Sequence, residues 1–280
     1  MPILLALTSA LVYGVADYCG GRASRFQPSA IVTLVGQMVS LVLVVGITLV
    51  IGTAVPGAGT FGWGIAGGSA GAVGLASLYH AFANGSMTVV APISAVVGAV
   101  LPLTVGLIDG ERPEPIAYVG IAAAVVAVAL VSGAIGERDR PTPMPIIGFA
   151  VLAGFGFGML FVALDRTDPD SGLWPLVAAR AASVPLLFLI CLVLGARVGD
   201  KRSVFGLAVI AGFLDMAANL AYLQAVRGGM LSVVAVVSSL YPASTVALAF
   251  VLDRERMNRW QGVGMGLAGL ALVMVTLGKT

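Results

Sequence analysis

Long apolar runs alternate with short polar connections along the whole chain. Each run is close to the roughly 20 residues that an α-helix needs to cross about 30 Å of hydrocarbon. Backbone amides inside a bilayer must be satisfied within the segment, and apolar runs without alternation are not barrel strands, so we predict helices. Ten spans are predicted, at residues 3–20, 30–51, 61–82, 87–107, 115–135, 145–164, 173–194, 204–225, 231–252 and 260–277.

The two halves of the chain resemble each other in sequence. Residues 88–91 (TVVA) recur 144 positions later as residues 232–235 (SVVA), and residues 109–112 (DGER) recur as 253–256 (DRER). A fixed offset of half the chain indicates duplication. Because five spans is an odd number, the second copy enters the bilayer from the opposite side. We therefore predict an all-α, polytopic membrane protein made of two inverted five-helix repeats, residues 1–140 and 141–280.

Composition supports the membrane prediction and excludes several classes of function. Hydrophobic residues make up 59% of the chain and charged residues only 10%, against about 25% charged residues in soluble domains. The net charge of +2 comes from scattered clusters, so no nucleic-acid partner is expected. Cys19 and Cys191 lie apart in apolar runs, and we expect neither a metal nor a cofactor. No basic segment precedes the first run, so we expect a retained span rather than a cleaved signal.

Ionisable residues inside the predicted spans are the first candidates for function, because charge at bilayer depth costs on the order of 2.5–3.5 kcal/mol. Asp215 lies near the centre of the eighth span, and Asn219 and Tyr222 follow on the same helical face. Arg180 lies inside the seventh span. Asp215 is predicted to exchange protons. Arg180 is predicted either to pair with Asp215 or to hold a substrate carboxylate bidentately. A static buried ion pair is the structural alternative.

Three further spans each carry a polar stripe. Asp17 shares a face of the first span with Tyr13, Gln37 lies in a polar stripe of the second span, and His80 is near the end of the third. At an offset of 143, Gln37 aligns with Arg180. An imidazole suits proton coupling, although a lone histidine at a helix end is commonly structural. Amides and phenols also connect helices. Five polar faces together predict a shared aqueous cavity.

Small residues and prolines inside the spans predict close packing and kinks. Glycine pairs four residues apart let helix backbones approach closely, either within the chain or, in the last span, across a dimer seam. Each proline inside a span removes one backbone hydrogen bond and serves as a hinge or is simply tolerated. The glycine pairs are Gly64/Gly68, Gly67/Gly71, Gly154/Gly158 and Gly262/Gly266, and the prolines are Pro92, Pro102, Pro185 and Pro242.

Charges in the connections bear on orientation and gating. Ten Lys and Arg residues follow the odd-numbered spans (22, 25, 138, 140, 197, 201, 202, 254, 256 and 259), against four on the other side (112, 166, 227 and 279). The positive-inside rule then puts both termini outside. Glu111 and Glu255, in the repeated acidic motif, are interpreted as helix-end or loop charges, with a gating salt bridge as the alternative.

Several motifs resemble one known family. They are VYGVADYCGG at residues 12–21, the turn GSMTVVAP at 85–92, and the sequences GER at 110–112 and RER at 254–256. With the doubled five-helix plan, they are similar to the EamA branch of the drug/metabolite transporter superfamily. The resemblance implies a ten-helix inner-membrane permease that exports small metabolites or toxic compounds, often against protons, through a cavity shared by both repeats. It also implies cytoplasmic termini, opposite to the charge count.

These observations predict a secondary active transporter in the cell membrane. It would move a small metabolite or drug-like solute by alternating access, coupled to protons, around a cavity lined by spans one, two, three, seven and eight. Its partners would be the solute, the lipid bilayer and the coupling proton, and the chain would act as a monomer or homodimer. A non-transporting membrane scaffold is the alternative. An intramembrane enzyme is less favoured, because His80 and the two aspartates lack any catalytic motif.

Overall fold

The computed structural model describes residues 1–131, 142–199, 204–253 and 259–277. These residues form helices, connections and no strand, with 85% helix. The predicted basic positions 138, 140, 201, 202, 254, 256 and 279, together with Glu255, lie outside the described residues, as does the predicted repeat boundary at residue 140. The all-helical prediction is confirmed for the part of the chain that is described.

A helix occupies the place of every predicted span. The helices are α1 (Pro2–Ser24), α2 (Ser29–Ile51), α3 (Ala58–Asn84), α4 (Met87–Ile108), α5 (Pro115–Val131), α6 (Met144–Asp165), α7 (Trp174–Val193), α8 (Phe205–Gly228), α9 (Leu231–Ser238), α10 (Pro242–Leu252) and α11 (Arg259–Leu277), with a short 3-10 turn at Pro169–Ser171. The predicted ninth span is two helices rather than one, because Pro242 has no amide hydrogen to continue the helical ladder.

Seven stretches of the described chain are long and apolar enough to cross a membrane. They are α1, α2, α4, α6, α7, α8 and the run Leu231–Leu252, which contains α9 and α10. Helix α3 is 27 residues long but rich in glycine, and the apolar parts of α5 and α11 are shorter. The protein is therefore a multi-pass membrane protein.

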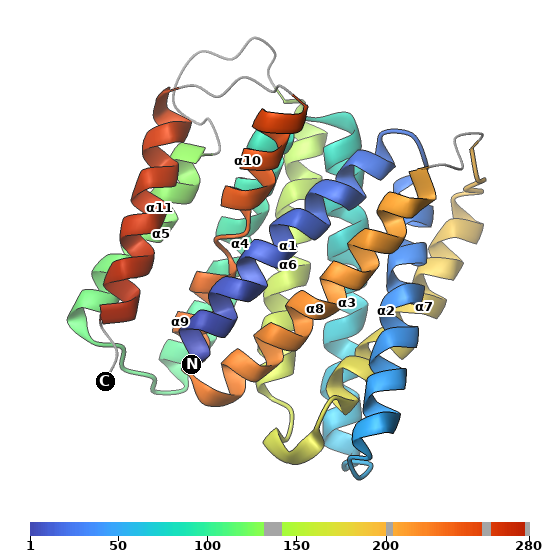
Figure 1. Ribbon diagram of the computed structural model, residues 1–280, viewed down its shortest axis with the longest axis horizontal. Coiled ribbons are helices and arrows are strands. Elements are labelled where there is room, and N and C mark those ends of the chain that lie inside the picture. Colours follow the sequence, from blue (N-terminus) through green and yellow to red (C-terminus); the bar gives the residue numbers. More distant parts are fainter. Residues whose placement is uncertain (132–141, 200–203, 254–258, 278–280) are drawn as a thin grey trace.

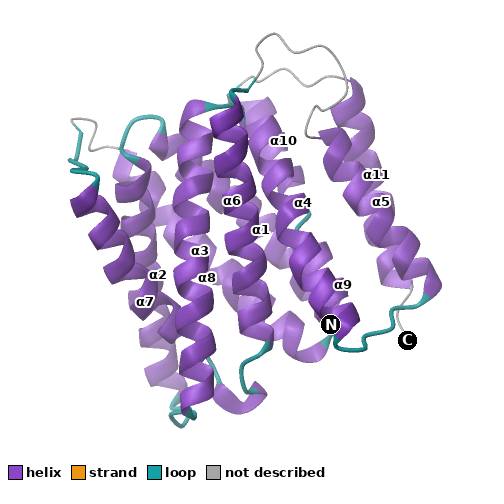
Figure 2. Cartoon of the chain, turned by 180° about the vertical axis from the view of Figure 1, so that it is seen from behind, coloured by secondary structure: helices purple, strands orange, loops and turns teal. Residues whose placement is uncertain are grey.

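The helices form a bundle in which distant parts of the sequence pack side by side. Helices α1 and α8 lie together on the face nearest the viewer in Figure 1, and α3 and α6 lie together on the face nearest the viewer in Figure 2. Helices α5 and α11 pair at one flank, and α2 and α7 pair at the other. Both termini lie at the same end of the bundle (Figure 1). The space between the two faces is where the functional candidates converge.

Glycines hold the two halves of the chain in close contact. A Cβ atom at Gly68 of α3 would collide with the backbone of Ala179 on α7, and one at Gly64 would lie 2.8 Å from the carbonyl oxygen of Pro175. Gly154 of α6 meets the backbone of α4 at Ser94 in the same way. These contacts confirm packing within one chain. Two further glycine pairs differ in their contacts. A Cβ atom at Gly67 or Gly71 would contact Leu160 of α6, whereas one at Gly262 or Gly266 would have no described atom within 4 Å.

Two ion pairs join the halves at opposite ends of the bundle. At the end distant from the termini, Asp253 after α10 pairs with Arg22 and Arg25 of the α1 end, with 3.1 Å from Arg25 Nη1 to Asp253 Oδ2. At the end near the termini, Asp109 after α4 pairs with Arg166 after α6. Asp109 and Arg166 are the residues 144 positions from Asp253 and Arg22. The two ion pairs therefore occupy equivalent positions in the two halves.

Glu111 acts at a helix end. Its carboxylate accepts hydrogen bonds from the amides of Leu231 (2.6 Å) and Ser232 (2.8 Å), at the start of α9. Those amides have no acceptor within their own helix, and a carboxylate also favours the positive end of the helix dipole. The interpretation of Glu111 as a helix-end charge is confirmed.

Close packing at Gly68 gives a direct test on a single helix. We expect Gly68→Ala to lower the free energy of unfolding by about 1–3 kcal/mol, because the added methyl has no room beside the Ala179 backbone. Gly62→Ala, also on α3 but with nothing within 4 Å of its Cβ position, is the matched control and should be neutral or slightly stabilising. Denaturant unfolding in detergent micelles measures both. Equal stability of the two variants would contradict the assigned packing.

Candidate functional site

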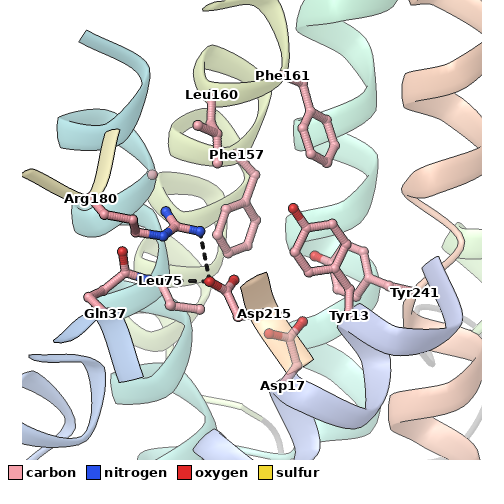
Figure 3. Close-up of a pocket in the computed structure, with 11 residues that line it drawn as sticks. Tyr13, Asp17, Gln37, Leu75, Phe157, Leu160, Phe161, Arg180, Asp215 and Tyr241 are labelled. Atoms are coloured by element: carbon pink, nitrogen blue, oxygen red, sulfur yellow. Dashed lines mark hydrogen bonds and ion pairs between the residues drawn. The ribbon is translucent and has the colours of Figure 1, made fainter. Parts of the chain in front are cut away.

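A small cavity of about 30 Å³ lies inside the bundle, between the α1/α8 face and the α3/α6 face. That space is large enough to hold a water molecule. The polar residues that line it come from α1, α2, α7, α8 and the turn between α9 and α10, and are Tyr13, Asp17, Gln37, Arg180, Asp215 and Tyr241. The other lining residues come from α3 and α6, and are Gly71, Leu75, Phe157, Leu160 and Phe161. Figure 3 shows these side chains.

An ion pair between Arg180 and Asp215 occupies one side of the cavity. Arg180 Nη2 donates to Asp215 Oδ2 at 2.8 Å, and both residues are buried, with relative exposures of 3% and 8%. Two charges inside an apolar bundle are tolerated only when they compensate each other and their remaining polar atoms find partners. The predicted pairing of these two residues is thus present.

Side chains from α2, α7 and α8 surround the Asp215 carboxylate. Asn219 Nδ2 donates to the Asp215 main-chain oxygen at 2.8 Å and to its Oδ1 at 3.3 Å. Ser40 Oγ and Gln37 Nε2 lie 3.5 Å from Oδ2. Ser183 donates to Gln37 Oε1 at 2.8 Å, which fixes the orientation of that amide. Asp215 is therefore held by groups from three helices.

Asp17 differs from Asp215 in having no counter-ion. Its side chain is 4% exposed and lines the cavity, yet it makes no hydrogen bond or ion pair with any described residue, and no dashed line reaches it in Figure 3. Tyr13, one helical turn earlier, also lines the cavity, and its hydroxyl has no partner in the described part of the chain. The cavity thus presents one unpaired carboxylate and one unpaired hydroxyl.

Aromatic rings form the wall opposite the ion pair. Phe161 of α6 stacks on Tyr222 with ring centroids 4.1 Å apart, and lies 6.3 Å from the Tyr13 ring. Phe157 meets Tyr241 edge to face at 6.4 Å. The Tyr241 hydroxyl lies 2.6 Å from Ser94 Oγ. The wall therefore presents ring faces and edges to whatever occupies the cavity.

The structure brings most of the predicted site residues together. Tyr13, Asp17, Gln37, Arg180 and Asp215 line the cavity directly, as the polar stripes predicted. Asn219 contacts Asp215 without lining the cavity.

Two predicted residues stand apart from the cavity wall. Tyr222 is fully buried behind Phe161, with its hydroxyl donating to the Phe161 carbonyl at 3.3 Å. His80 is not a lining residue: its ring packs against Phe149 of α6, with centroids 4.5 Å apart.

Sequence reasoning missed the apolar half of the lining. Leu75, Phe157, Leu160 and Phe161 are indistinguishable in sequence from lipid-facing or core residues of the same spans, so α6 was not predicted to contribute. Tyr241 could have been identified as a candidate from the sequence, because it immediately precedes Pro242 in an apolar run. A proline at that place has no amide hydrogen to continue the helical ladder, so it signals a break in the span.

No group of three or more His, Cys, Asp or Glu side chains able to hold a metal ion occurs within the described ranges. Among the lining residues the charged groups are two carboxylates and one guanidinium. A carboxylate can accept a proton or hydrogen bonds, and a guanidinium can donate hydrogen bonds.

Comparisons with known proteins add a family and a fold. Residues 144–277 match the sequence model described as the EamA-like transporter family. A search of curated proteins finds no match. A crystal structure described only as that of a protein is similar over 99% of this chain and 96% of its own, with a TM-score of 0.74 and 17% identity. At that identity the likeness shows a shared fold alone.

The Arg180–Asp215 pair has a measurable stability consequence. Arg180→Met leaves the Asp215 carboxylate buried without its counter-ion, so we expect a loss of about 3 kcal/mol in the free energy of unfolding. The double variant Arg180→Met, Asp215→Asn removes the uncompensated charge and should recover part of that loss. Denaturant unfolding of the purified variants measures the difference. A double variant less stable than the Arg180→Met single would contradict the pairing.

Proposed function

We propose that this chain, whose residues 144–277 match the EamA-like transporter family, moves a small solute across the membrane by alternating access. The family match supports a membrane transporter of the drug/metabolite type. In this proposal two inverted five-helix repeats rock against each other around the central cavity, and a proton gradient drives the solute. The bilayer and the solute are its partners.

The observation that carries the proposal is the charged cavity itself. Asp17, Arg180 and Asp215 are buried in a bundle of otherwise apolar helices and line one space. Ionisable groups at such depth are costly and mark solute and proton pathways. A membrane scaffold would be more stable without them, so the cavity favours transport over that alternative.

Equivalent positions support the inverted repeat. Six lining residues form three pairs at the offset of 144, namely Tyr13 with Phe157, Asp17 with Phe161, and Gly71 with Asp215. The packing of α1 on α8 likewise corresponds to that of α6 on α3. A duplicated chain that builds its cavity from both copies by the same positions is expected if a pseudo-two-fold axis relates the copies.

The two ion pairs at the bundle ends fit alternating access. Each joins one half of the chain to the other: Arg22 of α1 with Asp253 after α10, and Asp109 after α4 with Arg166 after α6. Opening the cavity at one end requires the halves to separate there. The proposed cycle therefore breaks one ion pair while the equivalent pair at the other end stays closed.

Proton coupling is assigned to the two cavity carboxylates. Asp215 and Asp17 line the same cavity and their charges interact, so a proton on either one lessens their repulsion. Protonation of Asp215 also weakens its attraction to Arg180, which connects α7 to α8. Proton binding thereby alters the contact between helices that line the site.

Transport in reconstituted vesicles tests the proposal. A panel of radiolabelled phenethylamine, phenylalanine, adenosine and benzoate is offered with and without an imposed pH gradient. We expect at least one solute to accumulate only with protein and gradient together, and Asp215→Asn to reduce the gradient-driven part at least about tenfold. Asp170→Asn, an exposed carboxylate after α6, is the control and should leave uptake unchanged.

Two outcomes of the vesicle experiment would overturn the assignment. Gradient-driven uptake by Asp215→Asn equal to that of the unmodified protein would reject its role in coupling. Absence of protein-dependent uptake of all four solutes, in vesicles where insertion is verified, would count against transport of these classes.

The ion pairs at the two ends are expected to control access from opposite sides. Leu75→Cys, introduced with Cys19→Ser and Cys191→Ser, places one thiol on the cavity wall for labelling by a membrane-impermeant maleimide. The Asp109–Arg166 pair is exposed and the Arg22–Asp253 pair is partly buried, and an exposed ion pair is worth up to about 1 kcal/mol. We therefore expect Asp253→Asn to raise labelling about two- to fivefold from the Arg22 side, and Asp109→Asn to raise it from the side of the termini.

The labelling experiment depends on the two variants raising labelling from opposite sides of the membrane. If Asp253→Asn and Asp109→Asn both raise labelling from the same side, or neither changes it, the ion pairs do not control access. Asp170→Asn again provides the matched carboxylate control.

A further inference from the structure

We propose that the cavity selects organic monocations that carry an ammonium group on a flat apolar body, with Asp17 as the residue that binds the ammonium. This inference rests on the proposed transport function and names the class of solute. The observation that supports it is that an unpaired buried carboxylate and several aromatic rings line the same cavity.

The charges of the lining residues do not balance. Asp215 and Arg180 neutralise each other at 2.8 Å, and the lining contains no second cation for Asp17. Asp17 in its ionised form therefore gives the cavity one net negative charge. A site of low dielectric amplifies that charge, so it attracts a cation and repels an anion.

The hydrogen-bonding groups of the cavity also favour an ammonium ligand. Asp17 is buried and unpaired within the described chain, and an ionised carboxylate only accepts hydrogen bonds. An ammonium supplies the donors and the charge that this carboxylate lacks. The free hydroxyl of Tyr13, one turn away on α1, can accept a further ammonium hydrogen or donate to a polar substituent.

Arg180 is not available to hold a carboxylate in place of Asp215. Its Nη2 is committed to Asp215, while its Nε has no partner among the described residues. A substrate carboxylate beside Arg180 would share its single positive charge with Asp215 and leave one buried negative charge uncompensated. The geometry therefore favours cations over anions and zwitterions.

The aromatic wall faces the position of the apolar body. At the offset of 144, the counterpart of Asp17 on α1 is Phe161 on α6, and that of Tyr13 is Phe157. One side of the cavity thus offers a carboxylate and a phenol, and the equivalent positions on the other side offer two phenyl rings. Aromatic faces attract both flat apolar groups and cations.

Three probes with one phenyl body and different head charges test the inference. They are phenethylammonium (positive), phenylalanine (zwitterionic) and 3-phenylpropionate (negative). Binding to the purified full chain in detergent at neutral pH is measured by calorimetry. We expect phenethylammonium to bind at least about tenfold more tightly than either of the others, because only it meets Asp17 without an opposing carboxylate.

Variants at Asp17 assign the effect to that residue. Asp17→Asn should weaken phenethylammonium binding about tenfold or more, while Asp17→Glu, which keeps the charge, should retain most of it. Asp170→Asn removes a carboxylate from the bundle end and should leave binding unchanged. The thermal unfolding midpoint of each variant confirms that the protein used is folded.

The outcomes separate this inference from the proposed transport function. Tighter binding of phenylalanine or 3-phenylpropionate, or unchanged phenethylammonium binding by folded Asp17→Asn, would overturn the monocation assignment, even if vesicles accumulate another solute. Asp17-dependent binding of phenethylammonium with no protein-dependent uptake into vesicles would instead support the site and count against transport.

Discussion

The structure depends on how an apolar bundle accommodates buried charge. Arg180 and Asp215 are stable at their depth only because they contact each other and because Gln37, Ser40 and Asn219 lie within hydrogen-bonding distance of the same carboxylate. These partners come from α2, α7 and α8, so the three helices are held at a fixed mutual distance. Asp215 has a counter-ion and hydrogen-bonding partners, whereas Asp17 has neither within the described chain, so the cavity contains one paired and one unpaired carboxylate.

Close helix contacts and the cavity are two results of the same packing. Gly64 and Gly68 draw α3 against α7, and Gly154 draws α6 against α4. Helix pairs that approach so closely leave little volume between them, and the remaining volume collects where large residues hold helices apart. Phe157 and Phe161 of α6 occupy that place, facing Tyr13 of α1. The glycines therefore position the cavity although only Gly71 lines it.

The sequence predicted the elements well and the site in part. Apolar runs of membrane length predicted the helices, with α9 and α10 merged into one span, because lipid leaves the backbone no alternative to internal hydrogen bonds. Polar stripes predicted Asp17, Gln37, Arg180 and Asp215 in one cavity, because a polar face in a bilayer must meet another. His80 was grouped with them, but its end of α3 packs on Phe149.

The aromatic residues that line the cavity could not be identified from the sequence, for a physical reason. In a membrane protein, a phenylalanine is equally stable against lipid, in the core or in a cavity, so its hydrophobicity carries no information about which it contacts. Tyr241 differs from these residues, because Pro242 directly after it signals the break that separates α9 from α10. Features that follow from pairing across the two halves need the fold before they can be recognised.

Positions 144 residues apart correspond in packing but differ in chemistry. Positions that line the cavity correspond between the halves, yet Asp17 corresponds to Phe161, and Asp215 corresponds to Gly71. The shared packing suits the rocking that we propose, because two equivalent halves would produce two equivalent openings. The asymmetric part is what selectivity requires, since a solute with a charged head and an apolar body needs two different walls. Each requirement constrains different residues, so the cavity could change its solute while the helices kept their packing.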